Sequence, residues 1–180
     1  METQTYKNLK DLPQTNFPEM IIVHHSGGTD ANPLADTSHH TAKIMEAYHI
    51  SLGWDGLGYH YVIEKDGAVW KGRPEHRNAA HTVGYNEKSI GICLSGNFDV
   101  TMPTTGQIEA LKGLIRDIQA RYPAITTDKI VPHRKYAKKS CYGNKLSDTW
   151  ASDLVKEKDS PTKDKILAQL EELKSLVSSL

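Results

Sequence analysis

Residues 20–25 read MIIVHH, a run of apolar and largely β-branched residues that ends in two histidines. Such a short run, followed by the loop Ser26-Gly27-Gly28, is typical of a buried strand. Side chains alternate between the two faces of a strand, so His24 and His25 point to opposite sides, and at most one of them enters a given site. The segment therefore predicts a strand that delivers one histidine to a site at its end.

The rest of the chain alternates between helix and strand patterns, without the long regular crossovers of a doubly wound sheet. We expect a helix over about 37–51, strands over 59–64 and 68–70 joined by a Lys-Asp-Gly turn, a strand over 89–95, a helix from a capping box at Thr104 and Gln107 to Pro123, and a short strand at 130–131. The predicted fold class is α/β, a single domain with a central mixed β-sheet flanked by α-helices.

The tail differs from the rest of the chain. After Trp150 the composition becomes polar, and from Ser160 apolar residues recur at four- and three-residue steps. These are Ile166, Leu170, Leu173, Val177 and Leu180. The pattern predicts a domain over 1–150, then a polar linker and a C-terminal helix over 151–180. About two heptads leave open whether this helix docks on its own domain or pairs with a second chain in self-association.

Composition excludes several classes of function. The 180 residues carry 22 lysines and arginines and 22 aspartates and glutamates, and this zero net charge argues against nucleic-acid binding. The start has no signal-peptide pattern and no apolar run spans about 18 residues, so we expect a protein kept in the cytoplasm of the producing cell until release, without stable membrane insertion. Cys93 and Cys141 suit a ligand or a buried thiol better than a disulfide in such a compartment.

The segment from His133 to Cys141 carries the first sign of chemistry. A histidine at a strand end and a cysteine eight residues later, across a polar loop, can surround one metal ion. With His24, they make two nitrogen donors and one thiolate, which leaves a fourth zinc position for water and favours a catalytic over a structural site. This spacing alone is weak evidence, because it is not one of the tight cysteine signatures.

Four segments carry a family resemblance: IIVHHSGG (21–28), GWDGLGYHYVIEKDGAVWKGRP (53–74), AAHTVGYNEKSIGICLSGNF (79–98) and VPHRKYAKKSC (131–141). From Ile21 to about Leu146 the chain resembles the zinc N-acetylmuramoyl-L-alanine amidases, a family that includes peptidoglycan recognition proteins and small phage endolysins. The resemblance implies one zinc ion, a peptidoglycan substrate and hydrolysis of the amide between N-acetylmuramic acid and L-alanine. Within this family the chain most resembles a phage or prophage endolysin.

The resemblance also assigns roles to residues. It implies His24, His133 and Cys141 as metal ligands and Tyr59 and Lys139 as catalytic residues. It places His81 along the substrate groove, with His25, Trp54 and Asn86 as further groove or supporting residues. These types suit amide hydrolysis, because zinc activates water and a phenol or cation stabilises the negative charge that develops on the carbonyl oxygen.

Two positions depart from the family pattern. Cys93 stands where some members carry a glutamate base, which favours the lytic subgroup and a buried strand thiol. Tyr142-Gly143-Asn144 follow the third ligand where many members have a proline, so the loop shape is open. Two alternatives remain, a non-catalytic peptidoglycan-binding protein and a cytoplasmic muropeptide-recycling amidase.

Overall fold

The computed structural model describes residues 1–29 and 31–156, together with Glu171, Lys174 and Val177. Its centre is a five-stranded sheet in the order β3-β2-β4-β1-β5. The strands are β1 (Met20–His25), β2 (Tyr61–Ile63), β3 (Val69–Lys71), β4 (Ser89–Leu94) and β5 (Ile130–Pro132). Strand β1 pairs in parallel with β4 and β5, β2 pairs in parallel with β4, and β3 is antiparallel to β2. The predicted mixed sheet is confirmed.

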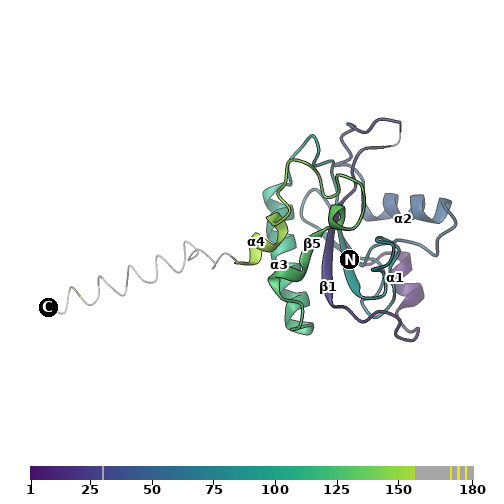
Figure 1. Ribbon diagram of the computed structural model, residues 1–180, viewed down its shortest axis with the longest axis horizontal. Helices are drawn as coiled ribbons and strands as arrows, with labels where there is room; N and C mark the ends of the chain where they lie inside the picture. The colour runs from purple at the N-terminus through teal and green to yellow at the C-terminus, as the bar shows by residue number, and fades with distance from the viewer. Residues whose placement is uncertain (30, 157–170, 172–173, 175–176, 178–180) are drawn as a thin grey trace.

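Helices cover both faces of this sheet. They are α1 (Gln4–Leu9), α2 (Ala42–Ser51), α3 (Thr105–Arg121) and α4 (Trp150–Lys156), with short 3₁₀ turns at Thr127–Lys129 and His133–Lys135. Figure 1 shows α1 and α2 on one side of the sheet and α3 and α4 on the other. Among the described residues, no helix combines the length and apolar character needed to cross a membrane.

Alternation along the strands divides the core in two. Val23, Ile92 and Ile63 belong to the larger cluster, which also holds Leu111 and Ile115 of α3. The residues that alternate with these along the strands point to the opposite face of the sheet. Val62 and Cys93 pack with Ala42 and Met45 of α2 and with Leu57 in a smaller cluster. His24 follows Val23 and therefore belongs to the α2 face, whereas His25 belongs to the α3 face.

The predicted helix boundaries hold at α3, whereas at α2 the predicted end at Ser51 is confirmed and the predicted start is wrong. Thr104 and Gln107 form the expected capping box, and α3 ends at Arg121, just before Pro123. By contrast, α2 begins at Ala42 instead of residue 37. The side chain of Thr41 caps the helix by accepting from the Ile44 N–H, and the preceding residues form turns.

Two short helices were not predicted. Helix α1 is fixed from outside its own sequence, because the Glu46 carboxylate of α2 accepts from the backbone N–H groups of Gln4 and Thr5. Helix α4 buries Ala151 and Ser152, and it packs against α3 and β5. Most of the predicted linker and terminal helix lies outside the described residues, so the division at residue 150 and the self-association through that helix stay predictions.

Candidate metal centre and groove

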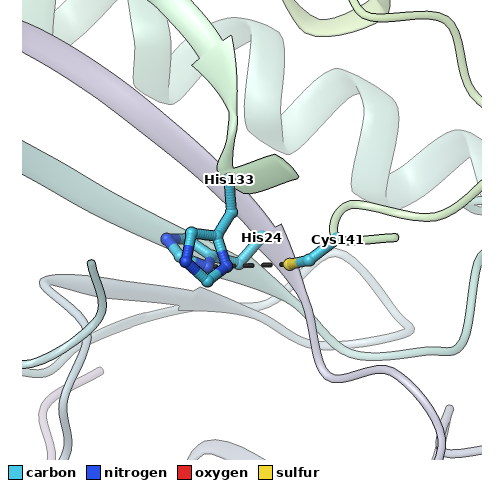
Figure 2. A group of neighbouring side chains, drawn as sticks. All are labelled: His24, His133 and Cys141. Carbon is cyan, nitrogen blue, oxygen red and sulfur yellow. Dashed lines mark hydrogen bonds between the residues drawn. The ribbon is translucent and has the colours of Figure 1, made fainter. Parts of the chain in front are cut away.

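Three donor side chains from distant parts of the chain meet at the carboxyl ends of strands β1 and β5. His24 is the penultimate residue of β1, His133 directly follows β5, and Cys141 comes from the loop after His133. One donor atom of each lies within 4.8 Å of the other two, and Cys141 Sγ is 3.6 Å from His24 Nδ1. Figure 2 shows the three side chains pointing toward one another. The predicted ligands are therefore brought together.

The donor set fits one zinc ion. With zinc bonds of about 2.1 Å to nitrogen and about 2.3 Å to sulfur, a tetrahedral site places these donors about 3.6 Å apart. Burial lowers the pKa of His24 well below its usual value and also lowers the pKa of His133, so both rings are neutral, the form that binds metal. Burial raises the pKa of the Cys141 thiol to about 12, so metal binding there must release a proton.

His81 contacts the first of these donors. Its Nδ1 lies 2.9 Å from His24 Nε2, and it also lies 2.8 Å from the Thr82 hydroxyl. The ring rests on Gly91 of β4, where an added Cβ would come within 2.4 Å of it. Gly91 therefore leaves the space that lets His81 reach His24. The sequence placed His81 along the groove, and the structure adds this role in orienting a ligand.

His25 faces away from the donors, as alternation predicted. Its Nδ1 accepts a hydrogen bond from the Phe98 N–H at 2.9 Å, and its ring packs on that of Phe98. Its backbone N–H points to Cys141 Sγ, at 3.4 Å. His25 thus supports the loop and the sulfur by packing and hydrogen bonding.

Tyr59 and Lys139 line the same cavity as the three donors, with a volume of about 610 Å³. The Tyr59 ring lies 5.2 Å from that of His24, measured between centroids. Burial raises the pKa of Tyr59 well above its usual value, with a further contribution from the neighbouring Cys93 and Cys141. Its hydroxyl is therefore a hydrogen-bond donor at neutral pH. Lys139 is exposed and brings a cation to the rim of the cavity.

A second cavity of about 350 Å³ continues the groove. It shares Trp54, His81, His133 and Lys139 with the first and adds Asn86. Trp54 stacks on His49 at 4.7 Å, so it forms part of the groove wall. The Asn86 side-chain oxygen accepts from the N–H groups of His81 and Thr82, at 2.9 and 2.8 Å. Asn86 therefore holds the loop of His81 in place.

Some supporting residues escaped sequence reasoning. The Asp99 carboxylate accepts from the Ser140 hydroxyl at 2.6 Å and from the Asn144 N–H at 2.7 Å, on either side of Cys141. An acidic residue after a strand gives no signal of such a partner 41 residues away. Cys93 is a free, buried thiol opposite His24 in the register of β1 and β4, which agrees with the predicted strand thiol.

The fold and the donor set define the chain as a candidate single-metal hydrolase of the α/β class. A family model described as N-acetylmuramoyl-L-alanine amidase matches residues 14–146. The chain therefore belongs to the N-acetylmuramoyl-L-alanine amidase family.

Known relatives agree with this family. Peptidoglycan-recognition protein SC2 of Drosophila melanogaster is 33% identical over 141 residues, which cover 76% of each chain. The endolysin of Enterobacteria phage T3 is 32% identical over 138 residues, which cover 73% of this chain and 85% of the endolysin. Among solved structures, the N-acetylmuramoyl-L-alanine amidase LysC from Clostridium intestinale URNW superimposes with a TM-score of 0.68 at 29% identity, covering 80% of this chain and 89% of that protein.

Proposed function

We propose that the chain is a zinc-dependent peptidoglycan hydrolase that cleaves the amide between N-acetylmuramic acid and the L-alanine of the stem peptide. The observation that carries this proposal is the meeting of His24, His133 and Cys141, with donor atoms within 4.8 Å of one another, in a groove that Tyr59 and Lys139 also line. Family membership supplies the bond that is cut. The donors, Tyr59 and Lys139 provide the groups that hydrolysis of this bond requires.

The residues around the donors suit amide hydrolysis. His24, His133 and Cys141 would hold the zinc ion, which would supply a water of lowered pKa, roughly 7 instead of about 15.7, and would polarise the scissile carbonyl group. Attack on the amide carbon moves negative charge onto the carbonyl oxygen. The Tyr59 hydroxyl, which stays protonated, donates a hydrogen bond to that oxygen, and the Lys139 ammonium group adds positive charge beside it. His81 keeps the ring of His24 in its orientation.

A direct test measures the new end that this reaction creates. Zinc-loaded protein is incubated with purified sacculi, and the release of free N-terminal alanine is followed by mass spectrometry. We expect alanine ends to appear, to stop forming after treatment with a chelator, and to return when zinc is added. Protein that binds the sacculi but releases no alanine end would show that it is a recognition protein instead.

The setting that we propose is lysis by a phage or prophage, with the protein acting on the wall after release from the producing cell. The similarity to the phage T3 endolysin supports it, because it extends over most of the length of that protein. Cys93, in place of the glutamate of some other members, also favours it. Activity on intact sacculi and on soluble muropeptides distinguishes a lytic enzyme from a muropeptide-recycling enzyme. A lytic enzyme clears the sacculi, whereas a recycling enzyme cleaves only the soluble fragments.

A further inference from the structure

Arg134 directly follows His133 in the chain, yet all its polar contacts reach the loop that carries Cys141. Its backbone N–H donates to the Cys141 carbonyl at 2.6 Å. In its guanidinium group, Nη1 donates to the Gly143 carbonyl at 2.7 Å, and Nη2 donates to the Leu146 carbonyl at 2.6 Å. One residue therefore joins two candidate metal ligands that are eight positions apart.

The loop needs donors of this kind. Residues 141–149 form turns, not helix or strand, and Cys141, Gly143 and Leu146 are buried. A buried carbonyl without a hydrogen-bond partner lowers the stability of the fold. In a strand, backbone N–H groups of the neighbouring strand are the donors, and in this loop a side chain must provide them. Arginine suits this task because its five N–H donors lie in one rigid plane and its charge is permanent.

Two further contacts fix the plane of the guanidinium group. Nε of Arg134 donates to the Asp148 carboxylate at 2.5 Å, and the Tyr142 ring lies below the group, 5.4 Å from its Cζ to the ring centroid. The Arg134 side chain is only 20% exposed, so solvent screening of these contacts is reduced. Tyr142 stands where many family members have proline, so in this chain the loop is held by a ring and an arginine together.

We infer that Arg134 is a positioning residue for the metal centre. By holding the carbonyls of the Cys141 loop, it fixes Cys141 Sγ at the distance from His24 that a tetrahedral ion requires. This inference rests on the metal site of the proposed function. It assigns Arg134 no contact with the substrate.

The first test measures how fast zinc leaves the loaded protein when a coloured chelator is in excess. Outer contacts of metal ligands typically contribute tenfold or more to metal affinity, so Arg134→Gln is expected to release zinc at least about tenfold faster. Arg134→Lys keeps the charge but loses the planar fork, and it should release zinc at least about threefold faster. Arg121→Gln is the matched control, because it removes an arginine that pairs with Glu75 through two nitrogens elsewhere in the protein. It should stay within about twofold of the parent.

The second test needs no metal. The zinc-free proteins are treated with a thiol reagent, and labelling of Cys141 and of Cys93 is followed separately by mass spectrometry. Arg134→Gln should speed labelling of Cys141 at least about fivefold while labelling of Cys93, which lies within the sheet, stays within about twofold. Unchanged labelling of Cys141 together with unchanged zinc release would overturn the inference. If Arg134→Gln does not fold, Arg134→Lys provides the test. Zinc release and Cys141 labelling at the parent rates in that variant would contradict a role for the planar guanidinium group.

These readouts separate this inference from the proposed function. A parent protein that binds zinc but cuts no peptidoglycan contradicts the proposed function. The zinc-release rates of the Arg134 variants still test the positioning role in that case. A parent protein that binds no zinc contradicts the proposed metal site, and the labelling of Cys141 then judges whether Arg134 holds the loop.

Discussion

Cys141 provides the only sulfur among the three candidate ligands. Cys141→Ala removes a donor 3.6 Å from His24 Nδ1, so zinc content should fall below about a tenth of an equivalent and amidase activity by at least about 100-fold. Metal analysis and the alanine-release assay measure both. Cys93→Ala is the matched control for zinc content, because this thiol is also buried and is not among the three donors. Full zinc and full rate in Cys141→Ala would show that the ligand assignment is wrong.

Tyr59 tests the part of the mechanism that lies outside the metal. Tyr59→Phe keeps the ring and removes the hydroxyl, so kcat should fall by about 10²-fold while zinc content is unchanged. Steady-state kinetics on soluble muropeptides measure this. The control is Tyr61→Phe, whose hydroxyl donates to Glu75 on the opposite face of the sheet. That variant should lose some stability and retain its kcat.

Lys139 gives a similar test with an exposed side chain. Lys139→Ala removes the cation from the groove, so kcat/KM should fall by about 10²-fold with zinc retained. Its neighbour Lys138 is also exposed and lines neither cavity of the groove, so Lys138→Ala should behave like the parent. Equal losses in the two variants would mean that general charge, and not the position of Lys139, matters.

Sequence reasoning placed the donor residues but not their supports. Strand alternation predicted that only one of His24 and His25 enters the site, and the family resemblance chose His24. The spacing of His133 and Cys141 suggested a site that the structure assembles. The roles of Arg134 and Asp99 were out of reach, because they depend on where loop carbonyls, hydroxyls and N–H groups lie after folding. Residue type alone does not indicate such partners.

At the level of elements, α3 combines a local start signal with a contact to a distant turn. The Thr104 hydroxyl accepts from the Gln107 N–H and donates to the Lys65 carbonyl in the β2–β3 hairpin. Thr104→Ala should therefore lower the free energy of unfolding by about 1–2 kcal/mol, with a fall of roughly 3 °C or more in Tm. Thermal and urea unfolding measure this. Thr105→Ala changes the next, exposed residue and should stay within about 0.5 kcal/mol of the parent.

Elements with strong local signals were predicted best. The strand 20–25, the hairpin and the capping box of α3 were confirmed because apolar runs, a Lys-Asp-Gly turn and paired cap side chains act within a few residues. Helix α1 was not predicted, because the Thr3 side chain that caps it is a weak local signal and Glu46, 41 positions beyond Thr5, supplies further acceptors at its start. The beginning of α2 was placed too early because the local pattern did not show that Thr41 is the cap.

At the level of the whole molecule, a buried histidine makes stability depend on pH. His60 Nδ1 accepts from the Gly91 N–H at 2.9 Å, and its Nε2 lies 3.0 Å from the Arg77 carbonyl, an arrangement that needs the neutral ring. Burial lowers the pKa of His60 to about 4, although the Arg77 carbonyl and Glu75 favour the charged form. Between pH 6.5 and 4 the unfolded chain therefore binds a proton that the folded protein does not. The stabilisation is present above pH 6.5 and is lost as the pH falls toward 4.

We expect urea unfolding to show this loss. The full change for one such group is about 3 kcal/mol, so the stability difference between the parent and His60→Gln should shrink by roughly that amount between pH 7 and pH 4. His39→Gln, at an exposed position, should track the parent at every pH. A difference between parent and His60→Gln that does not change with pH would contradict the assignment of a neutral buried ring.

The arrangement of β1 between β4 and β5 also sets an order of events during synthesis. His24 leaves the ribosome early, but its two partner donors follow only at positions 133 and 141. A nascent chain that ends before β5 has only His24 of the three donors and lacks the strand that carries His133 to it. The three donors of the proposed zinc site are therefore complete only after synthesis has passed Cys141, and a bound ion would report that β1 and β5 are paired.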